Sequence, residues 1–306
     1  MSLVEQMSKS LGLDTLYIEQ IARRNDLYAK YRVKKKNGGT REIYHPSKEL
    51  KVLQRWLAKN VFEAFPISDN SVAYSPGDCC KKNAQIHRKS RYFLHTDIKN
   101  FFPSITRQMM SRYFYLHSDI VRNLNLSDQD IDLILDICLF KGQYLVIGSP
   151  ASPCISNRFL YTFDLKLAEM LNTYGDYKYT RYADDIVVSS MYYISGEIVA
   201  EIDKLMGEVG VQRNVEKTYF MNRSKKCQIT GIVVDNNSYK MTVGNKKYKE
   251  LQRMIYKYLV KGEGSLDSVK GYLAYLKSVN LDQYSQLANI YNRYDKNNVL
   301  FGNGRN

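Results

Sequence analysis

The chain has 306 residues, with 45 Lys and Arg against 31 Asp and Glu, so its formal net charge is +14. Hydrophobic residues make up 44% of it, which excludes a chain that is disordered throughout. The positive excess favours a polyanionic partner, either nucleic acid or an anionic membrane surface. No run of about 18 apolar residues occurs, which argues against a membrane-spanning helix.

Cysteine usage indicates the compartment. The five cysteines include no CxxC pair, and only four histidines are present. The N-terminal residues MSLVEQMSKS have neither the basic nor the apolar region of a secretory signal. We therefore expect a cytoplasmic protein with reduced thiols, without a zinc site and without a membrane partner.

Apolar spacing and turn residues predict mixed secondary structure. In the first half we expect a helix at 10–30, strands at 31–36 and 40–44 around a turn at Asn37-Gly38-Gly39, a helix at 48–65, a strand at 92–98, and helices at 106–117 and 127–141. In the second half we expect an extended segment at 143–148, a helix at 153–171, strands at 177–190 around a turn at 183–185, a helix at 195–209, strands at 217–221, 227–234 and 239–243, and two helices from Tyr248 separated at 262–264. This order lacks a strict strand–helix alternation and favours an α+β fold.

Positive charge is concentrated in two segments. Residues 21–60 hold twelve Lys or Arg and three acids, and residues 81–91 hold five basic residues and no acid. A charged segment is often only a solvated face. Because both segments flank acidic motifs, we expect them to contribute to a phosphate-binding channel.

The most informative stretch is YTRYADDIVVSS at 179–190, in which Asp184 and Asp185 are adjacent between two strand-like halves. Adjacent carboxylates repel each other, and a bound divalent cation removes that conflict. Oxygen ligands suit Mg²⁺, which shares its coordination shell with substrate phosphates. An ordinary turn is the alternative for such a pair taken alone.

A third carboxylate, Asp97, lies at the end of a separate predicted strand in HTDIKNFFPSI. Three carboxylates from two elements can hold two metal ions about 3.5–4 Å apart, which is the arrangement used for in-line phosphoryl transfer. A helix cap or surface charge is the alternative for Asp97 alone. Together, the two acidic elements in basic surroundings favour nucleotidyl transfer.

The string Tyr182-Ala183-Asp184-Asp185 resembles the YxDD box of reverse transcriptases. Other strings resemble successive blocks of retroviral-type and bacterial reverse transcriptases, in the same order. With YADD they are GGTREIYHPSKELKVLQRWL, DIKNFF, GSPASPCISN and NVEKT, over about residues 30–245. The resemblance implies an RNA-directed DNA polymerase with an α+β right-hand fold of fingers, palm and small helical thumb.

The same resemblance implies a division of the chain. N-terminal helices and fingers would occupy residues 1–95. The palm would form most of residues 96–245, with a helical insertion at 104–142. Residues 246–306 would form the thumb.

By this resemblance, Asp97 and Asp184 would bridge two Mg²⁺ ions and Asp185 would complete the site. Phe102 would lie under the nucleotide sugar, where an apolar ring leaves no room or partner for a ribose 2′-hydroxyl. Arg41 would contact the incoming dNTP, for which a planar guanidinium is well suited. Lys217 would lie near the leaving pyrophosphate as a possible general acid.

Gly148 and Ser149 open a block that resembles the PQGxPxSP motif, in which glycine permits close approach to a nucleotide. Here Val146 and Ile147 stand where the motif usually has Pro and Gln. That difference removes a polar side chain expected near the nucleotide and removes no metal ligand.

Two further strings narrow the resemblance to retron reverse transcriptases. Asn83 and His87 match their NAxxH motif, and Thr230-Gly231 matches their VTG motif with Ile229 for Val. We expect Asn83, His87, Thr230 and Gly231 to contribute to RNA or template binding. In the basic thumb, Lys249 and Arg253 would grip the template–primer duplex.

A retron enzyme would bind a noncoding RNA from its own locus. It would prime from an internal guanosine 2′-hydroxyl and leave a branched RNA–DNA hybrid (msDNA). Retrons commonly act in anti-phage defence with a separate effector protein, which this chain does not encode. The alternatives are another bacterial reverse transcriptase (intron-type, diversity-generating or abortive-infection) and a non-catalytic RNA-binding structural subunit.

Overall fold

The structure is a computed structural model, and it describes residues 1–34 and 38–302. The N-terminal elements are α1 (Leu3–Leu11), α2 (Thr15–Arg23), β1 (Tyr28–Lys34), β2 (Thr40–Pro46), α3 (Lys48–Asn60) and α4 (Cys80–His87). The central elements are β3 (Tyr92–Asp97), α5 (Phe101–Ser104), α6 (Arg107–Leu116), α7 (Ser118–Asn123), α8 (Asp128–Cys138), α9 (Ser152–Phe159), α10 (Tyr161–Tyr174), β4 (Tyr177–Tyr182), β5 (Asp185–Ser190) and α11 (Glu197–Val209). The C-terminal elements are β6 (Tyr219–Asn222), β7 (Cys227–Ile229), β8 (Ile232–Val234), β9 (Met241–Thr242), α12 (Asn245–Lys261), α13 (Leu266–Val279) and α14 (Leu281–Tyr291).

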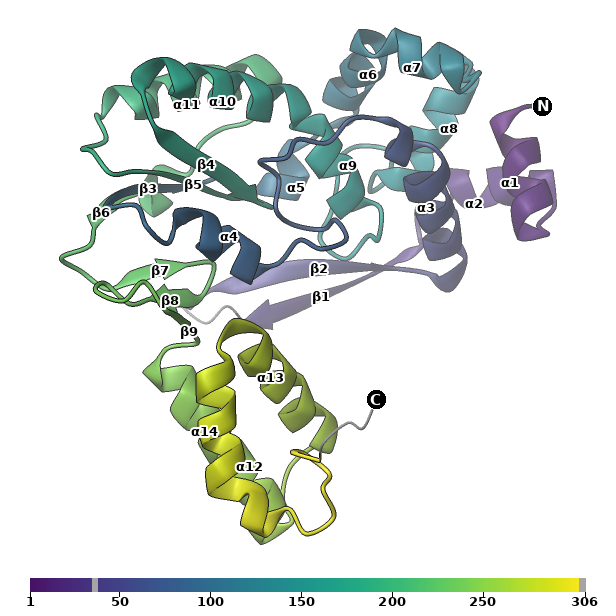
Figure 1. Cartoon of the computed structure of the whole chain (residues 1–306). Coiled ribbons are helices and arrows are strands. Elements are labelled where there is room, and N and C mark those ends of the chain that lie inside the picture. The colour runs from purple at the N-terminus through teal and green to yellow at the C-terminus, as the bar shows by residue number, and fades with distance from the viewer. Residues whose placement is uncertain (35–37, 303–306) are drawn as a thin grey trace.

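A four-stranded antiparallel sheet with the order β4-β5-β3-β6 forms the centre. Helices α10 and α11 cover one face of this sheet and α4 lies on the other (Figure 1). The apolar run Ile186–Val188 of β5 is buried, as expected for a strand covered on both faces. The register places Asp97 at the end of β3 directly opposite Asp185 at the start of β5.

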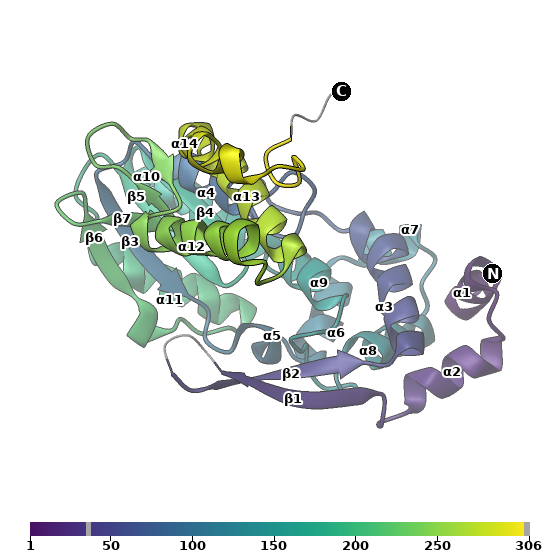
Figure 2. The same ribbon diagram turned by 90° about the horizontal axis from the view of Figure 1, so that it is seen from below.

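The hairpin β1–β2 extends as an arm along one side of the molecule (Figure 2). It is joined to the body by a backbone hydrogen bond of 2.9 Å from the Tyr44 amide to the Ile147 carbonyl. Most of its side chains are exposed, so its strands add little to the core.

The three C-terminal helices form a group that projects from the palm (Figure 1). Leu251 and Ile255 of α12, one turn apart, are buried in a second hydrophobic cluster. This cluster also takes in strands β7 and β8, for example through Cys227 and Ile232. The cluster also includes Ala84 of α4 and Phe93 of β3, and the thumb boundary at 246 stays a prediction.

Several predicted elements are divided in the structure. The helix expected at 10–30 is two helices and the start of a strand, because Gly12 ends α1 in a left-handed conformation (φ 66°) and Asp14 caps α2. The helix expected at 153–171 is divided at Leu160 into α9 and α10. Part of the turn predicted at Asn37-Gly38-Gly39 lies outside the described residues.

The strand expected at 227–234 is a hairpin of β7 and β8. Its turn is Thr230-Gly231, with φ angles of 43° and 85°. Two positive φ values are what a tight hairpin turn requires, and glycine adopts them without steric cost. Helices α4, α5 and α7 were not expected from the sequence, and the second helix expected in the tail is divided at Asn280 into α13 and α14.

Among the described residues, no helix combines the length and the apolar character needed to cross a membrane.

Candidate active site

The YADD string forms the turn between β4 and β5. Tyr182 pairs with Asp185, so Ala183 and Asp184 are the two turn residues. Ala183 has a φ of 59°, which is unfavourable for a residue with a Cβ atom. The Asp184 carbonyl accepts a hydrogen bond of 3.1 Å from the amide of Ile98, which fixes the turn against the end of β3.

This arrangement brings three carboxylates together. One oxygen from each of Asp97, Asp184 and Asp185 lies within 4.8 Å of the others. Burial raises the pKa of Asp184 to about 7, and the charges of Asp97 and Asp185 add to the effect. Burial and the Asp97 charge also raise the pKa of Asp185. The three carboxylates fit a divalent cation, because a cation would relieve this repulsion with oxygen ligands.

Two side chains from the segment before β6 hold Asp97. Lys217 Nζ donates to Asp97 Oδ2 at 2.6 Å, and Asn214 Nδ2 donates to Oδ1 at 3.3 Å. Burial lowers the pKa of Lys217, but the hydrogen bond to Asp97 and the charges of the three carboxylates outweigh it, so the pKa is raised overall. Lys217 therefore carries a stable positive charge at the site.

Asp97 and Asp184 lie in a cleft of about 630 Å³ between the hairpin β1–β2 and the end of β3. The predicted residues Arg41, Phe102 and Lys217 line this cleft together with Asp97 and Asp184. Other lining residues were not predicted as site residues, among them Tyr74, Asn100 and Asn214. Asn214 lies within the quoted NVEKT string, whereas Tyr74 carries no signal in the sequence.

Gly148 and Ser149 contact the protein itself. A Cβ atom on Gly148, which has a φ of 110°, would lie 2.3 Å from the Tyr44 carbonyl oxygen. Ser149 is buried, and its Oγ donates to Gln54 Oε1 of α3 at 3.1 Å. These two residues therefore join the palm to the hairpin and α3. A direct contact with nucleotide stays a prediction, as does the effect of Val146 and Ile147, which line the cleft.

The NAxxH residues are fully buried. The ring nitrogens of His87 lie 2.7 Å from Ser189 Oγ and from Thr180 Oγ1, and burial lowers the pKa of His87 to about 3. Asn83 Oδ1 accepts from Thr180 at 2.6 Å, and Asn83 Nδ2 lies 3.5 Å from Thr230 Oγ1. These residues fasten α4 to the sheet and to the β7–β8 turn.

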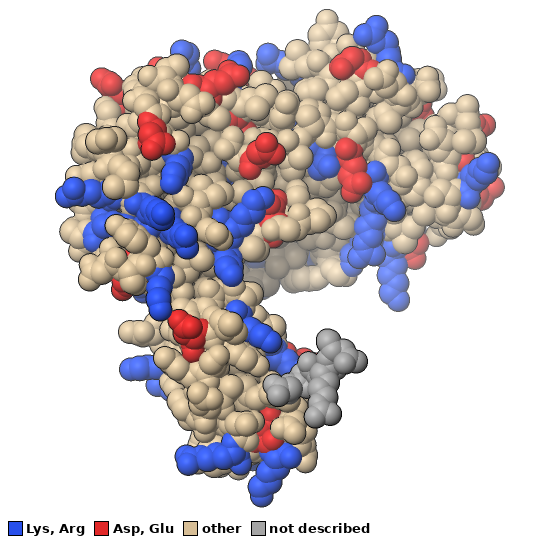
Figure 3. Space-filling view, in the orientation of Figure 1, with Lys and Arg blue, Asp and Glu red and all other residues tan. Residues whose placement is uncertain are grey.

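RNA contact by Asn83 and His87 stays a prediction, and it would require α4 to move from the sheet. Thr230 and Gly231 of the β7–β8 turn are partly exposed. Lys249 and Arg253, four residues apart, are both exposed on α12. In Figure 3 the molecule is hollowed between the thumb helices and the body, and Lys and Arg gather beside this hollow.

A family model for "Reverse transcriptase (RNA-dependent DNA polymerase)" matches residues 33–234. The Retron Ec73 reverse transcriptase of Escherichia coli is 31% identical over 287 residues, which cover 90% of this chain and 90% of that protein. The chain belongs to the retron-type reverse transcriptases. The Retron Ec86 reverse transcriptase of Escherichia coli is 27% identical over 88% of this chain and 82% of its own length.

The fold is also found in a solved structure of apo telomerase from Candida tropicalis, with a TM-score of 0.52 at 11% identity. The match covers 88% of this chain, which spans 58% of the telomerase chain. The predicted α+β polymerase fold is thus confirmed, and this retron-type reverse transcriptase is an RNA-directed DNA polymerase.

Proposed function

We propose that this enzyme copies part of its own structured noncoding RNA, primed from an internal RNA 2′-hydroxyl, to give branched msDNA within an anti-phage retron. The observation that carries the proposal is the convergence of Asp97, Asp184 and Asp185 in a retron-type chain, with Asp97 and Asp184 lining the cleft. A non-catalytic RNA-binding subunit has no need to gather three repelling carboxylates in a cleft.

Asp97, Asp184 and Asp185 would hold two Mg²⁺ ions, which when bound activate the priming hydroxyl and neutralise charge on the leaving pyrophosphate. Asp185 would lie beside the primer end. The raised pKa of Asp184 means that this carboxylate gives up its proton when it becomes a ligand.

The cleft residues supply the remaining contacts to the dNTP. Arg41 would bind its phosphates. The protonated Lys217 would break its hydrogen bond to Asp97 and donate instead to the leaving pyrophosphate. Phe102 would exclude a ribose 2′-hydroxyl by bulk. Gly148 and Ser149 would keep the cleft wall at the distance that these contacts need.

The RNA would lie across the basic surfaces. Lys249 and Arg253 would bind the phosphates of the template–primer duplex, and the Thr230-Gly231 turn would approach its end. The outer face of α4, with Lys81 and Lys82, and Lys89 just beyond its end would contact the noncoding RNA, while Asn83 and His87 fix the helix.

The remaining proposals concern cellular context. The five cysteines are free thiols, which supports a reducing cytoplasmic location. A separate effector protein encoded near this gene would complete the defence function.

Expression of the enzyme with its native locus tests the proposal. We expect an RNA–DNA species that a 2′–5′ debranching enzyme converts into a shorter product, and no such species from Asp184→Asn. RNA that co-purifies with an active enzyme but carries only linear DNA would contradict 2′-hydroxyl priming. It would favour another class of bacterial reverse transcriptase.

A further inference from the structure

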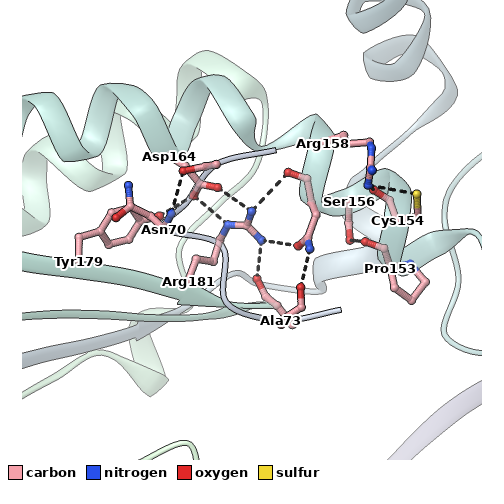
Figure 4. Close-up of polar contacts among 12 residues, drawn as sticks. Asn70, Ala73, Pro153, Cys154, Ser156, Arg158, Asp164, Tyr179 and Arg181 are labelled. Atoms are coloured by element: carbon pink, nitrogen blue, oxygen red, sulfur yellow. Dashed lines mark hydrogen bonds and ion pairs between the residues drawn. The ribbon is translucent and has the colours of Figure 1, made fainter. Parts of the chain in front are cut away.

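Arg181 and Asp164 form a fully buried ion pair (Figure 4). It lies next to the Ala183-Asp184 turn. Arg181 of β4 donates from Nε to Asp164 Oδ1 at 2.9 Å and from Nη2 to Oδ2 at 2.7 Å. The Tyr179 hydroxyl donates to Asp164 Oδ1 at 2.6 Å. Asp164, on α10, thus receives three hydrogen bonds inside the protein.

The other guanidinium hydrogens reach the turn and α9. Arg181 Nη1 donates to the carbonyl oxygen of Ala183 and to Asn157 Oδ1, both at 3.1 Å. Nη2 makes a longer contact of 3.4 Å with the Asn157 carbonyl. The five N–H groups of this side chain therefore have five partners, so the guanidinium has a single orientation.

The hydrogen bond from Arg181 to the Ala183 carbonyl also constrains the position of Asp184. The Ala183 carbonyl and the Asp184 amide belong to one planar peptide group. A hydrogen bond that holds the carbonyl oxygen therefore also fixes the nitrogen and Cα of Asp184. Ala183 is in the left-handed region, where a residue with a Cβ atom needs support from its surroundings.

The same network reaches the second wall of the cleft. Asn157 Nδ2 donates to the Ala73 carbonyl at 2.7 Å, and the next residue, Tyr74, lines the cleft with a φ of 68°. The backbone of Arg181 also pairs with this segment, since the Val72 amide donates to its carbonyl at 2.9 Å.

Stability alone gives a weak reason for such a pair. Replacing a buried ion pair by apolar residues of similar volume is often neutral or stabilising. What apolar residues cannot supply here is a donor directed at the Ala183 carbonyl.

We propose that Arg181 is a positioning residue, held by Asp164 and Asn157, that fixes the Ala183–Asp184 peptide so that Asp184 meets Asp97 and Asp185 as a metal ligand. The proposal rests on the metal-binding role proposed above for these carboxylates. Arg181 touches neither substrate nor metal, and its effect passes through the turn.

Arg181→Lys tests the proposal, because an ammonium keeps the charge for Asp164 but does not reach Ala183 and Asn157 together. We expect kcat for DNA synthesis on an RNA template to fall roughly 100-fold, as for a small misplacement of a catalytic group, with little change in KM for dNTP. We also expect weaker Mn²⁺ binding, measured from the spin-resonance signal of free Mn²⁺. Tyr179→Phe is the matched control, since it removes a bond to Asp164 and leaves the Ala183 contact.

Rescue separates positioning from general destabilisation. Glycine adopts a positive φ freely, so adding Ala183→Gly to Arg181→Lys should restore part of the lost Mn²⁺ affinity and kcat. Asn157→Ala tests the proposal without altering the guanidinium, should Arg181→Lys fail to fold. It removes the other acceptor of the Nη1 group that donates to Ala183 and so loosens that bond, and a smaller loss of Mn²⁺ affinity is expected.

Folded Arg181→Lys or Asn157→Ala with wild-type Mn²⁺ affinity and kcat would overturn the proposal. Equal losses in Tyr179→Phe would do the same. The branched-product assay on the wild type tests the proposed function separately. A wild type that makes no branched product contradicts that function. The Mn²⁺ affinities of the variants still decide the role of Arg181.

Discussion

The ionisation of Asp184 links the catalytic centre to the stability of the fold. Its pKa is about 7 in the folded protein against an ordinary value of 3.8, so the folded state holds this proton more tightly than the unfolded chain. The resulting stabilisation is full below about pH 4 and is lost as the pH rises through about 7. Ionised Asp184 therefore destabilises the metal-free protein at neutral and higher pH.

Replacing Asp184 by Asn should raise the melting temperature at pH 8 in EDTA. The gain should be about 2–4 °C for each kcal/mol of repulsion removed, and it should vanish near pH 4. Thermal unfolding followed by circular dichroism at both pH values measures this. A melting temperature that is unchanged or lowered at pH 8 would contradict the buried, mutually repelling cluster.

Phe102 is the residue that we predict selects the sugar. Its partly exposed ring lies in the cleft, 5.0 Å from the buried ring of Phe101 behind it. Phe102→Ala should open space for a 2′-hydroxyl and reduce the preference for dNTP over rNTP by roughly 10- to 100-fold. Single-nucleotide incorporation measures this preference. Phe101→Leu, which changes only the buried ring, should keep it.

Among the elements, the hairpin β1–β2 makes a very close backbone approach to the body at Gly148. Gly148 has no Cβ atom, which allows the Tyr44 carbonyl to lie against it. Gly148→Ala should lower the free energy of unfolding by about 2–4 kcal/mol, because the added atom must displace the strand backbone.

Gly264 provides the matched control for that substitution. Its φ of 105° is close to the 110° of Gly148, but a Cβ atom there would have no neighbour within 4 Å. Gly264→Ala should therefore cost only the backbone strain, about 1–2 kcal/mol. Equal losses in the two variants, measured by urea unfolding, would show that the contact with Tyr44 is unimportant.

The exposed basic residues of α12 should bind the template–primer duplex through its phosphates. Lys249→Gln and Arg253→Gln should each lower the slope of log affinity against log salt concentration by about 1. Lys204→Gln on α11, also exposed, should leave the slope unchanged. Fluorescence anisotropy with a labelled hybrid duplex measures the slopes, and unchanged slopes in the α12 variants would contradict this role.

The limits of sequence-based prediction follow from what each element buries. The strands at 92–98 and 177–190 were predictable because their apolar runs enter the core. Helix α4 was not, because its buried face consists of Asn83, Ala84 and His87, which give no hydrophobic periodicity. In α14 only Leu287 is buried, so no apolar pattern marked the point where the tail divides into α13 and α14.

Candidate catalytic residues were easier to predict than the buried residues that position them. The three carboxylates stand out because hard-metal chemistry requires that residue type at strand ends. The partnership of Arg181 with Asp164 and Asn157 has no sequence signal, because it depends on how α9, α10 and β4 pack.

At the scale of the whole molecule, the charge of +14 is spread over a body with two hydrophobic clusters. One cluster joins the N-terminal helices to the palm, and the other joins β7 and β8 to the thumb helices. Ile98 and Phe101 of the first cluster line the cleft, and Figure 3 shows Lys and Arg beside the hollow next to the thumb helices. We expect the nucleic acid to lie along this basic surface with its primer end at the three carboxylates.

The measurement that tests this account most directly is Mg²⁺-dependent extension of a DNA primer on an RNA template by wild type and Asp184→Asn. Asp119→Asn, at an exposed position on α7, serves as the control. We predict that Asp184→Asn loses about 100-fold or more of the rate while it keeps its fold and RNA affinity, and that Asp119→Asn matches wild type. A folded Asp184→Asn that extends the primer at the wild-type rate would contradict the account.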